Sequence, residues 1–426
     1  MNHTTSDGGR TLVAAASGGT ESMHGRSGRP AVLPRLVAVD AAVFARDHWG
    51  RRELLSRAEE LPRGFADLLS ADSIDELVSE RGLRTPFLRV AKNGSTLAER
   101  TFTAPGGVGA GIADQVSDDK LVALFADGAT IVLQALHRVW PPVLELCQQL
   151  AAELGHPVQA NAYVTPPQNQ GFSYHYVVHD VFVLQIEGEK RWRVHAPVLE
   201  SPLRDQPWSD RRSAVAARAA EQPLLEVVLQ PGDCLYLPRG FLHAATALGG
   251  VSTHLTIGVH TWTGYAVAEQ LVQQALSMVA DDPSVRASLP LGVDLAHPDC
   301  LTEDVDQVRD ALVAALGRTD LSRLSSVLQG SARGAQRAAP VGPLRQLRTA
   351  EALQPDTALV LRGHLAAVLD ELPAGTVLRS RAADFPVAGA EVTAVRALLD
   401  SGTATVEQLG ENLARRLVLS GLVLAR

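Results

Sequence analysis

The sequence has few cysteines, no excess of basic residues and no long apolar run, and each absence excludes a class of protein. Its three cysteines, Cys147, Cys234 and Cys300, are far apart and follow no CxxC or similar spacing, which predicts reduced thiols and a cytoplasmic location. The formal net charge of -8 disfavours a nucleic-acid partner. Because no apolar run reaches about 18 residues, no membrane-spanning segment is predicted.

The chain is long enough for a large hydrophobic core and for two or three domains. Of its 426 residues, 46% are hydrophobic and 20% charged, which is typical of a globular protein. Residues 1–32 are rich in Gly, Ser and Thr, and we predict a disordered tail there. The apolar stretch within it, Leu12 to Ala16, is too short for the core of a signal peptide.

The middle of the chain contains many short β-prone runs separated by Gly and Pro turns. One predicted turn is at Glu187-Gly188-Glu189. Helices are predicted mainly before the strands, including an amphipathic one over Pro141 to Leu154. We therefore predict an α+β protein with a double-stranded β-helix, or jelly roll, over residues 33–264. The predicted strands cover residues 85–90, 101–103, 130–134, 158–164, 173–183, 190–194, 225–229, 233–237 and 252–260.

After the predicted barrel the pattern changes to helix. Residues 265–330 contain two strongly periodic segments, which favour an antiparallel helix pair or a dimer contact. Residues 331–343 are predicted to be a linker. Short strands alternate with helices over residues 344–426, an order typical of a winged-helix-like domain, and the charge of the chain favours an interaction module over a DNA reader.

Two histidines and a lysine are the candidates for chemistry. His175 is at the start of a predicted strand, and His243 follows the Leu-Pro-Arg-Gly turn. At the mouth of a barrel they could bind one metal ion and leave open positions for substrate, although two ordinary polar residues explain the pair as well. Lys190, if it points into the barrel, needs an anion such as a dicarboxylate, because an unpaired buried ammonium is costly.

Several stretches together resemble a known family. The stretches are RTPFLR, ADQV, DGATIVLQALHRVWPP, ANAYVTPPQNQGF, HDVFVLQIEGEKRWRV, PGDCLYLPRGFLHAA and HLTIGVH. From about Leu33 onward the chain is similar to the bacterial cupin-type JmjC proteins, which include the ribosomal-protein hydroxylases. The resemblance implies a JmjC barrel, a helical dimerisation segment that forms a homodimer, and a winged-helix-like C-terminal domain.

The resemblance also implies cofactors and site residues. It makes His175 and His243 ligands of Fe(II), and it makes Lys190 the partner of the distal carboxylate of 2-oxoglutarate, the cosubstrate. Asn161 and Tyr163 are then residues of the cosubstrate pocket. The activity implied is the hydroxylation of a protein or peptide side chain, with a ribosomal protein as one substrate to consider.

Val177 departs from the family pattern. The family has Asp two residues after the first histidine, where it completes a triad of two histidines and one carboxylate. Val removes a ligand and a negative charge, so the affinity for iron should fall. If the predicted strand is continuous, His179 is about 13 Å along it from His175 and too far to replace the acid. Asp180 falls on the opposite face, where we expect it to make a structural hydrogen bond.

Three interpretations of Val177 remain open. The chain is a weakened oxygenase, a non-catalytic binding module that keeps the pocket, or a variant that binds a halide in the gap, as related halogenases do. The halide interpretation is the least favoured because Val tends to fill the space that the ion needs. Val also suits a strand, which agrees with a fold that has lost catalysis.

Four further features have weaker claims on the site. His254 and His260 fall on one strand face, and His254 either reaches the cosubstrate pocket or is an ordinary core histidine. Trp192 is expected to point inward as a structural residue. Arg239 either steers an acidic cosubstrate or caps its turn, and the polar loop Gln168 to Gly171 either contacts a peptide or is simply solvated.

Overall fold

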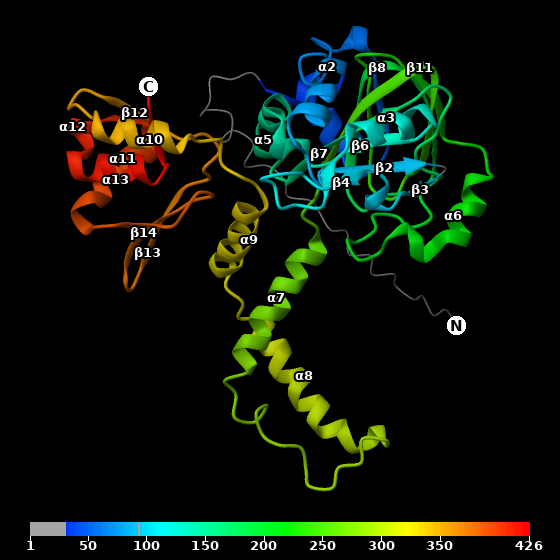
Figure 1. Ribbon diagram of the computed structural model, residues 1–426. Coiled ribbons are helices and arrows are strands. Elements are labelled where there is room, and N and C mark those ends of the chain that lie inside the picture. Colours follow the sequence, from blue (N-terminus) through cyan, green and yellow to red (C-terminus); the bar gives the residue numbers. More distant parts are fainter. Residues whose placement is uncertain (1–30, 93) are drawn as a thin grey trace, which may run out of the picture. The chain divides into compact units, whose positions relative to one another are not determined.

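The computed structural model describes residues 31–92 and 94–426, and a nine-stranded antiparallel sheet forms its largest part (Figure 1). This mixture of helices with antiparallel strands confirms the predicted α+β class. The tail predicted for residues 1–32 lies outside the described residues, except for Ala31 and Val32. The sheet consists of β1 (Leu54–Ser56), β2 (Leu88–Lys92), β3 (Ser95–Thr96), β6 (Thr130–Leu133), β7 (Val158–Thr165), β8 (Asp180–His195), β9 (Leu225–Leu229), β10 (Cys234–Leu237) and β11 (Leu242–Val259).

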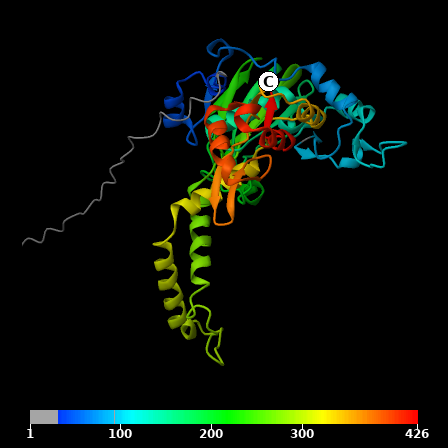
Figure 2. The ribbon, with the colours of Figure 1, turned by 90° about the vertical axis from the view of Figure 1, so that its left-hand side faces the viewer.

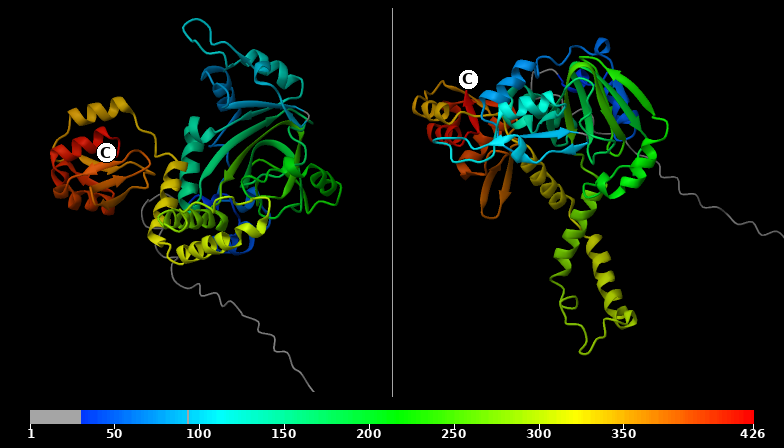
Figure 3. Two further views of the ribbon diagram at one scale, coloured as in Figure 1. Left: turned by 90° about the horizontal axis from the view of Figure 1, so that it is seen from below. Right: turned by 45° about the vertical axis from the view of Figure 1, so that its right-hand side comes forward.

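Two long strands, β8 and β11, run side by side through the sheet (Figure 3). The turn predicted at Glu187-Gly188-Glu189 is therefore wrong, since β8 continues through it. The predicted strand that began at residue 173 is also wrong in its start, because β8 begins at Asp180 and His175 forms only an isolated bridge with His243.

The glycines that suggested turns form a bulge instead. Residues 249–252 of β11 face Gly188 of β8, because the register shifts between the pairs Leu248–Glu189 and Thr253–Glu187. Gly188 has a φ of 63°, and a Cβ there would meet the Val251 carbonyl oxygen at 2.1 Å. Only glycine fits this position, so its role is close backbone approach.

Helices cover the sheet where apolar positions recur at helical spacing. In α5 (Pro141–Leu154) the buried residues include Val143, Leu146 and Leu150, which join the main hydrophobic core. This helix begins with prolines and ends at Leu154, which is the range expected from the sequence. Gly155 follows as the cap in the left-handed conformation. The other helices of this part are α1 (Ala41–Val43), α2 (Ala71–Asp75), α3 (Asp118–Ala126), α4 (Leu136–Val139) and α6 (Arg212–Ala219).

Shorter elements complete this part of the chain. Single turns of 3-10 helix occur at Leu33–Arg35, Ala58–Glu60, Glu99–Thr101 and Trp208–Arg211, and π-helical turns extend α1 and α2 over Phe44–His48 and Glu76–Glu80. The strand predicted over residues 101–103 is reduced to β4 (Thr103–Ala104), which pairs with β5 (Gln115–Val116) outside the large sheet. The glycine-rich segment between β4 and β5 is the loop of this hairpin.

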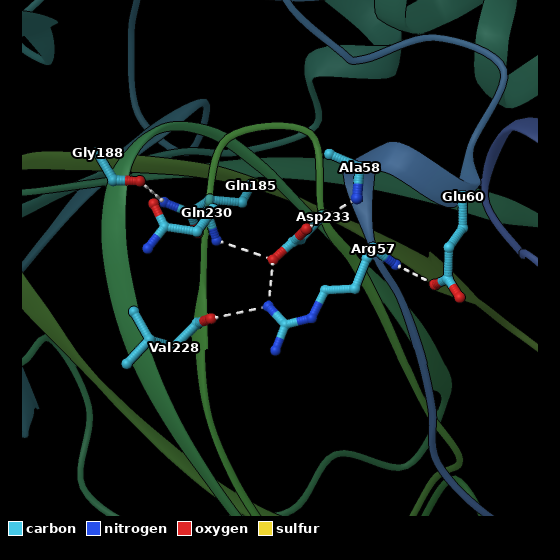
Figure 4. A network of polar contacts seen from close by, with 8 residues as sticks. All are labelled: Arg57, Ala58, Glu60, Gln185, Gly188, Val228, Gln230 and Asp233. Atoms are coloured by element: carbon cyan, nitrogen blue, oxygen red, sulfur yellow. Dashed lines mark hydrogen bonds and ion pairs between the residues drawn. The ribbon is translucent and has the colours of Figure 1, made fainter.

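A buried carboxylate joins the N-terminal segment to the barrel (Figure 4). Asp233, which is 1% exposed, accepts hydrogen bonds from the backbone amides of Ala58 at 2.9 Å and Gln230 at 3.0 Å. The Arg57 guanidinium donates to the same carboxylate at 2.7 Å and to the Val228 carbonyl at 3.1 Å. Because each acceptor atom of Asp233 is satisfied, its charge is stabilised in the interior.

We expect Asp233→Ala to lower the free energy of unfolding by about 2–4 kcal/mol, because it leaves buried amides and a guanidinium without an acceptor. Arg57→Ala is the matched control and should cost about 1 kcal/mol, since this side chain is 36% exposed and water can replace it. Urea unfolding of the three proteins measures both values. Equal losses for the two variants would contradict the network described here.

The segment after the barrel is helical. It consists of α7 (Gly264–Val279), α8 (Thr302–Leu316) and α9 (Leu321–Ala335), and α7 and α8 pack side by side (Figure 2). The predicted second periodic run is two helices, because Gly317 ends α8 and the Asp320 side chain caps α9. Since α9 extends to Ala335, the linker predicted over residues 331–343 begins as helix.

The C-terminal residues form a second hydrophobic core of their own. Gly410, whose φ is 79°, separates two short helices near the end of the chain. The winged-helix-like assignment and the domain boundaries remain predictions. The elements are α10 (Pro343–Glu351), β12 (Ala358–Leu361), β13 (Val368–Leu372), β14 (Gly375–Arg379), β15 (Phe385–Val387), α11 (Val392–Ser401), β16 (Thr403–Thr405), α12 (Val406–Leu409), α13 (Glu411–Leu419) and β17 (Val423–Ala425), with one 3-10 turn at Gly389–Glu391.

Within the described residues, no helix combines the length and the hydropathy that a membrane span requires.

Candidate functional site

A cavity of about 710 Å³ lies inside the barrel and is lined by β2, β7, β8 and β11 and by the segment before β8. Strand β7 supplies one wall by simple alternation. Asn161, Tyr163 and Thr165 line the cavity, while the alternate residues Ala160 and Ala162 belong to the hydrophobic core. Asn161 is held by a hydrogen bond of 2.9 Å, in which its Oδ1 accepts from the Ala135 amide.

His175 and His243 meet on one side of the cavity. Their backbones form an isolated bridge, and their ring centroids are 4.6 Å apart. Nδ1 of His175 is 2.8 Å from the Ser173 carbonyl oxygen, and Nδ1 of His243 is 3.1 Å from that of Phe241. A carbonyl oxygen only accepts, so both Nδ1 atoms carry the proton and both Nε2 lone pairs remain available to a metal ion.

Burial keeps both rings neutral. It lowers the pKa of His175, and burial together with the neighbouring His175 lowers the pKa of His243 to about 3. Neutral imidazole is the form that binds a metal ion.

Lys190 is the second feature of the cavity. It is 3% exposed, its Nζ donates to the Thr165 hydroxyl at 2.9 Å, and it lies 3.3 Å from Nδ1 of His254. His254 stacks on Tyr163 with centroids 4.9 Å apart, and burial and the charge of Lys190 hold its pKa well below the ordinary range. Among the described residues no carboxylate pairs with Lys190, so the ammonium is hydrogen-bonded but not neutralised.

Val177 lines the same cavity as the two histidines and packs against the apolar cluster that contains Trp192. His179 also lines the cavity, where it stacks on His260 with centroids 4.9 Å apart. Asp180 is 0% exposed and accepts from the Tyr236 hydroxyl at 2.6 Å and the Arg239 amide at 3.0 Å. The predicted structural hydrogen bond of Asp180 is therefore confirmed.

Comparison with known proteins places this geometry in a family. Residues 137–267 match the model of the JmjC domain family, and this region contains both histidines, Lys190 and most of the cavity wall. The chain contains a JmjC domain. The family resemblance stated from the sequence is thereby confirmed.

Relatives of the JmjC chain include two curated proteins. Ribosomal oxygenase 1 of Gallus gallus is 32% identical over 299 residues, which is 67% of this chain and 46% of that protein. The bifunctional lysine-specific demethylase and histidyl-hydroxylase NO66 of Drosophila persimilis is 26% identical over 306 residues, 68% of this chain and 42% of the relative. The chain thus spans less than half the length of these two relatives.

A solved structure shares the fold. Ribosomal oxygenase YcfD of Escherichia coli superimposes with a TM-score of 0.55 at 18% identity, covering 92% of this chain and 99% of that one. The same protein has been solved in complex with cobalt and 2-oxoglutarate. The likeness confirms the predicted cupin-type architecture of the JmjC domain.

The JmjC site fits a metal ion only in part. The two histidines offer neutral nitrogen donors, but the described residues contain no group of three or more His, Cys, Asp or Glu side chains that could hold a metal. His179 precedes β8, which begins at Asp180, so it does not lie on a continuous strand with His175. His179 nevertheless does not complete such a group.

The residues with weaker claims on the site differ in whether they line the cavity. Trp192 points inward as predicted and lines the cavity, with its indole nitrogen buried and without a partner among the described residues. Arg239 donates to the Thr261 hydroxyl at 2.8 Å and lies 3.7 Å from Asp180, outside the cavity lining, so it braces its own turn. Of the loop Gln168 to Gly171, only Gly171 lines the cavity.

Sequence reasoning missed Thr165, Arg89 and Phe172. Thr165 continues the alternation of Asn161 and Tyr163, and that period of two was the available signal. Arg89 lines the cavity from β2, between the buried Leu88 and Val90, and the same alternation could have revealed it. Phe172 had no such signal, because it lies in an irregular loop.

The charge of Lys190 should be visible in the stability of the ligand-free protein. Burial lowers its pKa to about 7, whereas the unfolded chain keeps the ordinary value near 10.4. Between these two values the unfolded state binds the extra proton, so stability rises with pH across this window. From pH 7 to pH 9 we expect a gain of about 2 kcal/mol relative to Lys190→Met, measured by urea unfolding. An identical pH dependence in both proteins would contradict the lowered pKa.

Proposed function

We propose that this JmjC chain is an Fe(II)- and 2-oxoglutarate-dependent oxygenase that acts on a protein or peptide side chain, with a metal site weakened by Val177. The observation that carries the proposal is the Lys190 ammonium, buried in the same cavity as the His175 and His243 pair without a carboxylate partner among the described residues. The relatives named as oxygenases and hydroxylases, and the cobalt and 2-oxoglutarate complex of YcfD, support the same chemistry.

Each residue has a definite role in this proposal. Lys190 and the Thr165 hydroxyl bind the distal carboxylate of 2-oxoglutarate, and the stacked rings of Tyr163 and His254 form the wall beside it. His175 and His243 hold the metal ion through Nε2. When bound, the metal supplies the redox chemistry by which oxygen and 2-oxoglutarate oxidise the substrate. The substrate, with a ribosomal protein as the first candidate, is proposed from the relatives' names alone.

Restoring the acid tests the role of Val177. We expect Val177→Asp to raise the affinity for a divalent metal ion by roughly tenfold or more. Loss of a residue that only hydrogen-bonds to a metal ligand already lowers metal affinity by about that factor, and Asp would be a ligand itself. Turnover of 2-oxoglutarate, measured as succinate release with added iron, should rise from a low level in the unchanged protein. Metal binding is measured independently, by calorimetry with a divalent cation.

The controls separate the two halves of the site. Val177→Asn matches the shape of Asp without its charge and should bind metal more weakly than Val177→Asp. Lys190→Met should lose 2-oxoglutarate binding while retaining the metal affinity. If neither the unchanged protein nor Val177→Asp turns over 2-oxoglutarate, catalysis at this site is excluded.

A non-catalytic binding module is the second candidate. It is favoured by the packing of Val177 against apolar residues and by the absence of a three-ligand group among the described residues. Binding of 2-oxoglutarate without metal and without turnover, also after Val177→Asp, would identify it. The halide variant is disfavoured because Val177 packs against apolar residues, and its side chain tends to fill the space that a halide needs. We also propose a cytoplasmic location, because Cys147, Cys234 and Cys300 are unpaired.

We further propose that the helical segment forms a homodimer. Most of the exposed large apolar side chains of the described residues belong to residues 265–330. They include Leu276 on α7, 44% exposed, and Val313 on α8, 63% exposed. Monomeric proteins rarely expose such a group of apolar residues, so a second copy of the segment is the proposed cover.

Sedimentation equilibrium should give twice the 45.3 kDa mass of one chain. We expect the double variant Leu276→Glu, Val313→Glu to sediment at half the mass of the unchanged protein, because the charges disfavour an apolar interface. Leu372→Glu, at an exposed position of β13, is the matched control and should leave the dimer intact. A monomeric unchanged protein would refute the dimer.

A further inference from the structure

The cavity carries positive charge that the proposed cosubstrate site does not use. Three cationic side chains line it, Lys190, Arg89 and Arg138, and no Asp or Glu lines it among the described residues. With Asp at position 177 the cavity would contain one carboxylate, so Val177 makes the imbalance larger. Lys190 is assigned to the cosubstrate, which leaves the two arginines.

Arg89 is held in place without an anion. It lies on β2 opposite Val132 of β6, and its guanidinium carbon is 5.2 Å from the centroid of the Phe172 ring. Its Nε is buried, and among the described residues it has no hydrogen-bond partner and Arg89 has no ion pair. A half-buried guanidinium in this state is stabilised by a carboxylate, whose two oxygens match its paired donors.

Arg89 acts on the part of the cavity next to the histidines. Phe172 lies between them, with its ring centroid 5.9 Å from that of His175 and 5.2 Å from the guanidinium carbon of Arg89. Lys190 comes from a different strand and contacts Thr165 and His254 instead. The two cations therefore belong to different walls of one cavity.

Arg138 adds to the same field. It lies on α4, lines the cavity, and its pKa is lowered by burial and by the neighbouring charge of Arg337. A lysine or arginine side chain entering this cavity would meet guanidinium groups and no carboxylate. A carboxylate entering it would meet groups of the opposite charge.

We propose that the side chain bound beside the histidine pair is acidic, an aspartate or glutamate of a peptide or protein, with Arg89 as its carboxylate partner and Phe172 as the ring against which it lies. The inference rests on the proposed function only in that the cavity admits a second molecule beside 2-oxoglutarate. It names a substrate class opposite in charge to the lysine in the name of the NO66 relatives.

Capped tripeptides Gly-Xaa-Gly, with Glu, Asp, Gln or Lys at the centre, test the proposal by ligand-observed NMR on the full chain with saturating 2-oxoglutarate. We expect the Glu or Asp peptide to bind at least about tenfold more tightly than the Gln and Lys peptides, since a desolvated charged hydrogen bond contributes on that scale. Arg89→Gln should remove the preference, Arg89→Lys should keep part of it, and Arg89→Glu should favour the Lys peptide.

Arg191→Gln is the matched control, because Arg191 is exposed on β8 outside the cavity lining, and its loss should change no affinity. The dissociation constant of 2-oxoglutarate is measured in parallel on every variant. If Arg89→Gln weakens 2-oxoglutarate binding as much as peptide binding, Arg89 belongs to the cosubstrate site and the inference fails. A Lys peptide that binds as tightly as the Glu peptide also overturns it. If 2-oxoglutarate does not bind at all but the acidic preference persists, the proposed function fails and the acidic site stands.

Discussion

The pairing of β8 with β11 is the constraint on which the cavity depends. The two register segments, one on either side of the bulge, place Lys190 and Trp192 of β8 and His254 of β11 inside the barrel. A slip of one residue would turn all of these side chains outward, because alternate residues of a strand point to opposite faces. Gly188 fixes that register, since only glycine permits the approach of the Val251 carbonyl. Gln185 strengthens it by donating to the Ser252 hydroxyl of β11 at 2.9 Å.

The positive charge of the cavity is not balanced, because no Asp or Glu of the described residues lines it. A buried lysine, two arginines and four histidines share a space that no carboxylate lines among the described residues. Such a cavity is poorly suited to an empty state, because the buried Lys190 has lost water and has no carboxylate partner among the described residues. Binding of anions is then favoured by the site as a whole, before any single contact is considered.

The sequence predicted much of this protein because the informative residues follow simple periods. Helix α5 and strands β6, β7 and β9 were predicted within a residue or two, since alternation or helical spacing continues along each. The family motifs identified the JmjC domain. The prediction from sequence was wrong where a glycine is compatible with two structures, a turn or a bulge. Gly188 ends no strand, and whether glycine makes a turn or a bulge depends on the partner strand, which local sequence does not contain. The alternation of β2 indicates that Arg89 faces away from the buried Leu88 and Val90, but only the folded sheet shows that this face lines the cavity.

The bulge of residues 249–252 divides β11 into two halves that are anchored independently. Leu242 to Leu248, with His243, pairs with the end of β8, and Thr253 to Val259, with His254, pairs with its beginning and with β7. Gly249 and Gly250 are exposed, no atom lies within 4 Å of a Cβ at either, and Gly249 has a φ of 64° that favours glycine. Residues inserted between Gly249 and Gly250 would extend into solvent without changing the strand pairing of either half. The barrel therefore has a position at which an extra loop, a label or a fused peptide could be introduced while the cavity keeps its geometry.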